Sequence, residues 1–215
     1  MNLANKLTIF RMILVPIFVI VGYLGTLGII SGEFLEIPLF LWIMNIVFII
    51  ASITDKLDGY IARSRNQVTT FGKFLDPLAD KILVLSALVM LVEFGKIPAW
   101  IPVIVLSREF IVSGYRLLAV EKGGKVIAAS IWGKLKTVTQ MIAIILMFVD
   151  KYNFFDFVRS TTNEVQALSS SFQIYMSQGD IILNIITSII MLISVIATIV
   201  SGYDYLKNGK DLFKE

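Results

Sequence analysis

Four aspartates stand in two pairs whose spacing could bring their carboxylates together. Asp55 and Asp58 are three residues apart in the sequence, and Asp76 and Asp80 are four residues apart. Side chains at these separations lie on the same face of a helix. If the two helices are antiparallel neighbours, all four carboxylates converge on one small volume. Carboxylates gathered in one small volume repel one another strongly, above all in surroundings of low dielectric constant, unless they are protonated or joined by cations.

The chemistry open to this cluster is limited to oxygen ligands, because the 215 residues include no His and no Cys. That absence excludes Ser-His-Asp and Cys-His catalysis, zinc fingers, Cys-ligated iron–sulfur clusters and disulfides. Oxygen-only ligands favour a hard divalent cation such as Mg²⁺ or Mn²⁺. Two such ions that share carboxylates can clamp the attacking and leaving oxygens of a displacement at phosphorus. The residues therefore predict phosphoryl or phosphatidyl transfer.

A simpler interpretation of the same residues is that they are interfacial acids, paired with the nearby cations Arg63, Lys73 and Lys81. A single aspartate at a helix end would suit that interpretation. Four aspartates in matched helical spacing, with Gly59 and Gly72 between the pairs, favour a ligand site instead, because small residues leave room for a ligand near the backbone.

The elements that must position these residues are membrane helices. Of the whole chain, 57% is hydrophobic and 16% charged, against about 45–50% and about 25% in soluble domains. A bilayer core needs roughly 20 apolar residues of helix. Six stretches qualify, at about 8–29, 36–54, 78–95, 97–119, 127–149 and 180–206. We predict one all-α integral membrane domain over residues 1–215, with six transmembrane helices. Pro77 suits the first turn of the third helix, which would make Asp76 its N-terminal cap.

The distribution of positive charge predicts the orientation. If these six spans alternate, the side opposite the aspartates has only Lys96, Lys151 and Arg159 of the 19 Lys and Arg residues. Cytoplasmic loops are rich in Lys and Arg, so both termini and the aspartates are expected in the cytoplasm. The polar 150–179 connection is then an outer, solvated loop, with a possible surface helix. We assign the excess of positive charge to topology and anionic lipid, and expect no nucleic acid partner.

The acidic segment also resembles the signature of a known family. The pattern D-x2-D-G-x2-A-R-x8-G-x3-D-x3-D, from Asp55 to Asp80, is similar to that of the CDP-alcohol phosphotransferases. The resemblance implies that Asp55, Asp58, Asp76 and Asp80 hold two divalent cations, Mg²⁺ or Mn²⁺, and that Asp80 is the general base. It implies attack by an acceptor hydroxyl on the β-phosphorus of CDP-diacylglycerol, with CMP leaving and no covalent enzyme intermediate. It also implies a homodimer in the bacterial cytoplasmic membrane.

A second element, Asn5-Lys-Leu7-Thr8-Ile-Phe-Arg11, is similar to the part of this family that helps to hold the cytidine diphosphate. On the resemblance, the nucleotide and diphosphate pocket is lined by Asn5, Thr8, Gly59, Ala62, Arg63 and Gly72.

Four cations bear on the choice of acceptor: Arg108, Arg116, Lys134 and Lys136. They could simply tether the chain to anionic lipid. A buried cluster of cations suits an acceptor with a phosphate group, and suits choline or ethanolamine poorly. Glycerol 3-phosphate and an inositol phosphate both fit on charge alone. The segments 107–114 and 133–140 resemble the branch of the family that makes phosphatidylglycerophosphate, which implies glycerol 3-phosphate.

The rival function from another class is a small cation transporter, because charged residues within a membrane often mark permeation paths. Two features of the sequence disfavour it. The aspartates gather at one membrane face, and no inverted repeat or broken midplane helix is evident. The enzyme is therefore the preferred hypothesis.

Overall fold

The computed structural model describes the backbone of residues 3–64, 70–121, 131–158 and 176–208. Inside these ranges it leaves out the side chains of residues 3–5, 56–64, 70–77, 80, 120 and 208. The chain divides into two compact units. The first comprises Met1–Gly95 with Met147–Lys151, and the second comprises Lys96–Leu146 with Tyr152–Glu215. Each unit is described by itself.

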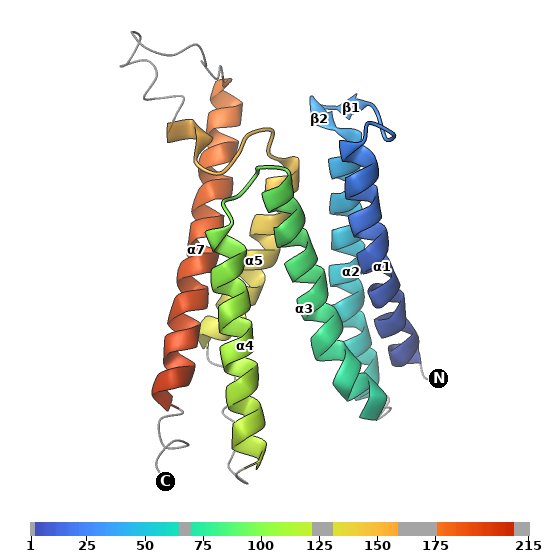
Figure 1. Cartoon of the computed structure of the whole chain (residues 1–215), viewed down its shortest axis with the longest axis vertical. Coiled ribbons are helices and arrows are strands. Elements are labelled where there is room, and N and C mark those ends of the chain that lie inside the picture. The colour runs from blue at the N-terminus through green and yellow to red at the C-terminus, as the bar shows by residue number, and fades with distance from the viewer. Residues whose placement is uncertain (1–2, 65–69, 122–130, 159–175, 209–215) are drawn as a thin grey trace. The chain divides into compact units, whose positions relative to one another are not determined.

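Three long helices build the first unit: α1 (Leu3–Thr26), α2 (Leu39–Ser64) and α3 (Thr70–Glu93). Helix α1 packs against both α2 and α3, and α2 runs antiparallel to α3, which follows it in the chain (Figure 1). Apolar side chains such as Phe18, Met44 and Phe48 are fully buried. The rings of Phe18 and Phe148 meet edge to face, with 5.8 Å between centroids.

A short hairpin precedes α2, where the sequence predicted only the start of a span. Strands β1 (Glu33–Phe34) and β2 (Ile37–Pro38) pair antiparallel, and Phe34 lies opposite Ile37. The two residues of the turn, Leu35 and Glu36, both have positive φ, 54° and 60°. Two-residue hairpin loops usually place Asn or Gly at such positions. The hairpin could not be predicted because neither residue is present in this turn.

Two glycines of α1 allow close packing inside the first unit. A Cβ atom at Gly25 would overlap the ring of Phe40 on α2, and one at Gly22 would meet the terminal methyl of Met90 on α3. Gly28 is different, because it lies after the helix with φ +71° and has open space around it. Gly22 and Gly25 therefore serve helix packing, whereas Gly28 serves the turn.

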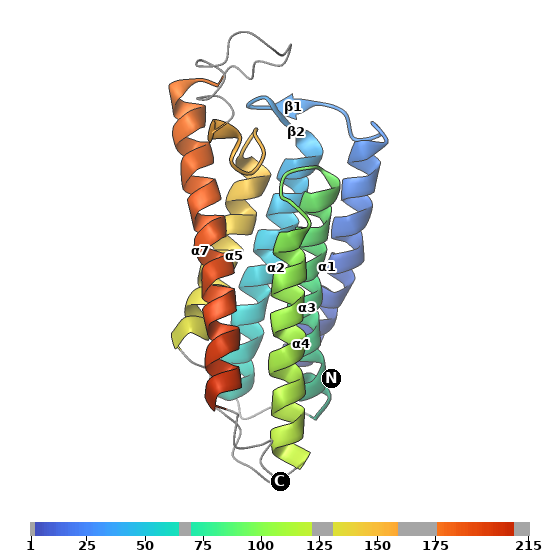
Figure 2. The ribbon, with the colours of Figure 1, turned by 60° about the vertical axis from the view of Figure 1, so that its left-hand side comes forward.

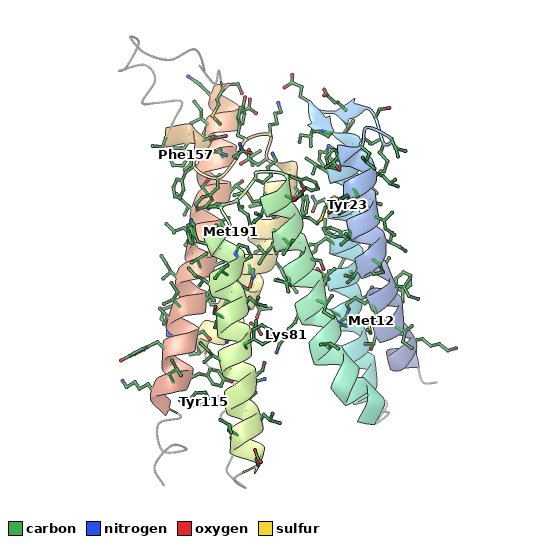
Figure 3. The ribbon with its side chains drawn as sticks, in the orientation of Figure 1. Met12, Tyr23, Lys81, Tyr115, Phe157 and Met191 are labelled. Atoms are coloured by element: carbon green, nitrogen blue, oxygen red, sulfur yellow. The ribbon has the colours of Figure 1, made fainter. Side chains whose placement is uncertain are left out.

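The second unit contains α4 (Trp100–Glu121), the part of α5 (Ile131–Val149) up to Leu146, and α7 (Gln178–Asn208). Helix α7 packs against α4 (Figure 2). Its buried side chains include Met191 (Figure 3). They also include the small hydroxyl side chains of Thr187, Ser188, Ser194, Thr198 and Ser201. Ser194 and Thr198 donate hydrogen bonds to backbone carbonyls within the helix, so these polar groups are satisfied within the apolar interior.

The beginning of the 150–179 connection is tied to α7. Asn184 Oδ1 accepts a hydrogen bond from the backbone N–H of Phe157 (Figure 3) at 3.0 Å, and its Nδ2 donates to the carbonyl of Asn153 at 2.9 Å. Ser188 accepts from the N–H of Phe155, also at 3.0 Å. This first part of the predicted loop is therefore only partly solvated, because its backbone is paired with buried side chains of α7. Residues 159–175 lie outside the described residues.

Three of the described helices are long and apolar enough to cross a membrane, namely Lys6–Thr26, Ile131–Val149 and Gln178–Lys207. In α2 the apolar stretch is shorter, Leu39–Asp55, because Asp and Lys residues follow it. Helix α4 is interrupted by Arg108, Glu109 and Arg116. The charges that interrupt the apolar pattern thus include predicted site residues, namely Asp55 in α2 and Arg108 and Arg116 in α4.

Candidate active site

The signature aspartates lie on two consecutive helices of the first unit. Asp55 and Asp58 belong to the C-terminal half of α2, and Asp76 and Asp80 to the N-terminal half of α3. Because α2 and α3 are antiparallel and in contact, these halves lie at the same end of the unit. Among the side chains that the structure describes, no three acidic residues form a group that could hold a metal ion. Of the four signature aspartates, only the side chain of Asp55 is among them.

The predicted N-terminal cap at Asp76 is wrong. Helix α3 begins at Thr70, so Asp76 and Pro77 both lie inside the helix. Residues 70–75 already form helix before the proline. Pro77 therefore lies beyond the first four residues, whose N–H groups have no partner, and it removes one hydrogen bond from the helix. Asp76 and Asp80 are therefore held at helical spacing, one turn apart.

Asp55 is bound by a cation from α1. The Nη1 atom of Arg11 lies 2.5 Å from Oδ1 of Asp55; the arginine side chain is fully buried, and the aspartate side chain is 30% exposed. A charge-assisted hydrogen bond of this kind limits the rotamers of the carboxylate. Arg11 therefore fixes one oxygen of the first signature aspartate and leaves the group partly open.

Two side chains of the N-terminal element, Thr8 and Arg11, thus face the interior of the first unit. Thr8 is 1% exposed and precedes Arg11 by three residues, on the same face of α1. The side chains of Asn5, Gly59, Ala62, Arg63 and Gly72 lie outside those that the structure describes, so their pocket-lining role stays a prediction. In the sequence analysis, Arg11 was only part of the N-terminal element and one of the cations that predict the membrane orientation. The regular spacing of residues 5, 8 and 11 was the available signal that this arginine faces inward.

Replacing Arg11 with methionine is expected to destabilise the protein, because the change leaves the carboxylate of Asp55 without its buried partner. Breaking a fully buried ion pair from one side costs about 3–5 kcal/mol, and we expect a smaller loss here because the Asp55 side chain is 30% exposed. Thermal unfolding in detergent measures the effect, with Lys6→Met as the control, since Lys6 is exposed on the same helix. An unfolding temperature equal to that of the control would show that the pair contributes nothing to stability.

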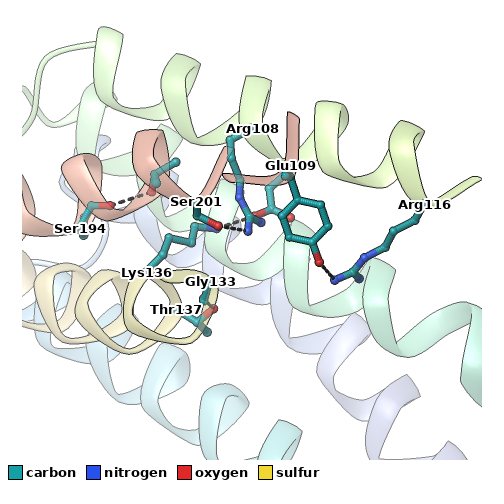
Figure 4. Close-up of polar contacts among 10 residues, drawn as sticks. Arg108, Glu109, Arg116, Gly133, Lys136, Thr137, Ser194 and Ser201 are labelled. Atoms are coloured by element: carbon teal, nitrogen blue, oxygen red, sulfur yellow. Dashed lines mark hydrogen bonds and ion pairs between the residues drawn. The ribbon is translucent and has the colours of Figure 1, made fainter. Parts of the chain in front are cut away.

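In the second unit, Glu109 of α4 joins two of the predicted acceptor cations (Figure 4). Its Oε1 lies 2.9 Å from Nη1 of Arg108 and 2.5 Å from Nζ of Lys136 on α5. All three side chains are 20% exposed or less. The carboxylate offsets part of the positive charge, which makes it possible to bury both cations.

The other two cations differ from each other. Arg116 donates from Nη2 to the hydroxyl of Tyr205 on α7 at 2.8 Å, although much of the arginine is exposed. Lys134 is exposed, and among the described residues it has no hydrogen bond or ion pair of this kind. The structure therefore joins Arg108 and Lys136 through Glu109. Arg116 is linked to the same region through Tyr205, whereas Lys134 is exposed.

The sequence analysis missed three members of this cluster. Glu109 lies in the segment 107–114 but was given no role of its own, and Ser201 and Tyr205 were included only in the predicted span 180–206. Ser201 accepts a hydrogen bond from Nη2 of Arg108 at 2.6 Å. The two residues are 93 positions apart in the sequence, so only the packing of α7 on α4 reveals the contact. A cluster of buried cations with one internal carboxylate is suited to binding an anion with more than one negative charge.

Comparison with known proteins identifies the class. The model of the CDP-alcohol phosphatidyltransferase family matches residues 1–200, a range that contains both the aspartates of α2 and α3 and the cations of α4 and α5. The chain belongs to this family of membrane enzymes. The resemblance drawn from the aspartate pattern is confirmed.

Individual relatives share one name. The chain is 49% identical to CDP-diacylglycerol–glycerol-3-phosphate 3-phosphatidyltransferase of Bacillus subtilis over 147 residues, which are 66% of this chain and 74% of the relative. It is 46% identical to the enzyme of that name from Haemophilus influenzae over the same length, 66% of this chain and 73% of the relative. It is 34% identical to the Rickettsia bellii enzyme of that name over 215 residues, which are 99% of this chain and 97% of the relative.

Proposed function

We propose that this protein transfers the phosphatidyl group of CDP-diacylglycerol to glycerol 3-phosphate and releases CMP. The product is phosphatidylglycerophosphate, a phospholipid precursor. The family match over residues 1–200 and the shared name of the relatives support this reaction. The observation that carries the choice of acceptor is the buried pair Arg108 and Lys136 around Glu109, because an acceptor with its own phosphate group suits such a cluster.

The residues on α2 and α3 fit a pair of hard divalent cations, Mg²⁺ or Mn²⁺. The donors are carboxylate oxygens, which such ions prefer. Arg11 binds one oxygen of Asp55, and the aspartate side chain remains partly exposed. Helical spacing favours convergence of the two aspartate pairs. We propose Asp55, Asp58, Asp76 and Asp80 as the ligands. When bound, such ions neutralise the charge that develops on the attacking and leaving oxygens.

The remaining roles belong to side chains of the protein. Asp80 takes the proton from the acceptor hydroxyl as the hydroxyl attacks the β-phosphorus, and the bond from that phosphorus to the CMP oxygen breaks. Asn5, Thr8, Gly59, Ala62, Arg63 and Gly72 line the pocket for the cytidine diphosphate. Arg108, Arg116, Lys134 and Lys136 attract the acceptor phosphate, and Arg108 and Lys136 lie in the buried part of that cluster.

We further propose one membrane domain with six spans, both termini in the cytoplasm and the aspartates at the cytoplasmic face. The support is the family match over residues 1–200, six long helices among the described residues, and the excess of Lys and Arg in the segments that alternating spans place on the side of the aspartates. The apolar side chains exposed along these helices face membrane lipid. On the family resemblance, we expect a homodimer in the bacterial cytoplasmic membrane.

An inositol phosphate is the second candidate acceptor, because it carries the same phosphate group. A competition assay separates the two. The purified protein in detergent is given CDP-diacylglycerol, Mg²⁺ and equal concentrations of radiolabelled glycerol 3-phosphate and inositol phosphate. We expect the glycerol label to enter lipid in step with CMP release. Entry of the inositol label instead would contradict the proposed acceptor, and ion flux in proteoliposomes without CMP release would favour the transporter.

A further inference from the structure

The last helix contributes two side chains to the cation cluster of α4. Nη2 of Arg108 donates to Oγ of Ser201 at 2.6 Å, and Nη2 of Arg116 donates to the hydroxyl of Tyr205 at 2.8 Å (Figure 4). Ser201 is fully buried and Tyr205 is 2% exposed. These contacts join α7 to two arginines that are two turns apart on α4.

Tyr205 interacts with both arginines through its ring as well. The guanidinium carbon of Arg108 lies 5.9 Å from the ring centroid and that of Arg116 lies 5.6 Å from it. A guanidinium at this distance is attracted by the negative face of an aromatic ring. The ring of one tyrosine thus attracts both guanidinium groups, which offsets part of the repulsion between the two positive charges.

The arginines keep donors for a ligand. A guanidinium has five N–H groups, and the contacts of Arg108 with Glu109 and Ser201 use one from each terminal nitrogen. Its Nε is buried and has no hydrogen-bond partner among the described residues. A buried donor without a partner is costly, so an anion that accepts this hydrogen bond would relieve the cost.

We propose that Ser201 and Tyr205 are positioning residues of the acceptor site: they hold Arg108 and Arg116 in the conformation that binds the phosphate group of the acceptor. This inference rests on the proposed function. A free arginine side chain samples many rotamers, and a site that is already ordered binds its ligand more tightly. Ser201 and Tyr205 therefore set the KM for the acceptor and leave the reaction at the β-phosphorus to the aspartates of the first unit.

Initial-rate kinetics of the full chain in detergent test the proposal. Tyr205→Phe keeps the ring and removes the hydroxyl, and Ser201→Ala removes the other hydrogen bond. Each is expected to raise the KM for glycerol 3-phosphate about three- to tenfold, with little change in kcat or in the KM for CDP-diacylglycerol. Tyr205→Leu also removes the ring, so we expect a larger increase. Tyr203→Phe is the matched control, because Tyr203 is 67% exposed on the same helix.

Two readouts separate a positioning role from a purely structural one. Ser201→Thr, which keeps a hydroxyl, should restore the KM for glycerol 3-phosphate. Tyr205→Phe should unfold at the same temperature as the wild type. A normal KM in both Tyr205→Phe and Ser201→Ala would overturn the proposal. So would a uniform loss of kcat together with a lower unfolding temperature in these variants.

Calorimetric titration with inorganic phosphate distinguishes failure of this inference from failure of the proposed function. If the wild-type protein does not use glycerol 3-phosphate but Tyr205→Phe still weakens phosphate binding several-fold, the proposed function is wrong and the role of α7 stands. If the wild-type protein is active and its phosphate affinity equals that of Tyr205→Phe, the role of α7 is wrong and the proposed function stands.

Discussion

Replacing Asp80 with asparagine is expected to reduce CMP release by about 10²–10⁴-fold, the usual contribution of a general base. Asparagine is close in size to aspartate but cannot take a proton from the acceptor hydroxyl, and it lacks the charge of a metal ligand. Asp80 belongs to α3, within a long regular helix. We therefore expect the variant to keep its helical content and its unfolding temperature.

Glu93→Gln is the matched control for this experiment, because Glu93 ends the same helix and its side chain is exposed. It also removes one carboxylate from α3, but away from the half that carries Asp76 and Asp80. The control should release CMP at the wild-type rate. Turnover by Asp80→Asn at a rate near that of the control would remove Asp80 as the base.

Removal of divalent cations is expected to have a comparably large effect. A chelator in excess should stop CMP release, and added Mg²⁺ or Mn²⁺ should restore it, because hard divalent ions are the match for an oxygen-only set of ligands. The assay measures release of CMP with both substrates at saturating concentration. The same chelator loaded with Mg²⁺ beforehand is the control for side effects on the detergent micelle. Undiminished turnover in excess chelator would contradict a metal-dependent reaction.

Local spacing was the source of the correct predictions. The two aspartate pairs lie on helices, as their separations of three and four residues predicted, and the helices are consecutive and antiparallel. Helical spacing also accounts for the burial of Arg11, because residues 8 and 11 lie on the same face of α1 and both are buried. Patterns of this kind are encoded within one or two turns of helix, so a single sequence contains them.

Contacts between distant segments were not predictable in the same way. Arg11 reaches Asp55 across 44 residues and Arg116 reaches Tyr205 across 89. In a chain with so many apolar helices, the sequence does not say which face of one helix meets which face of another. The start of α3 was also misplaced, because Pro77 is typical of a first helical turn but lies inside the helix. The turn at Leu35 and Glu36 has no sequence signal of the usual kind.

The most direct test of the aspartate site is a titration of the purified, metal-free protein with Mn²⁺, followed by electron paramagnetic resonance. We predict two bound Mn²⁺ ions per chain, close enough for their spins to couple. The double variant Asp58→Asn/Asp76→Asn should retain its helical content and lose this coupled signal. Full binding of two ions by that variant, or turnover by a wild-type protein with no bound ion, would contradict the assignment of the four aspartates as the metal site.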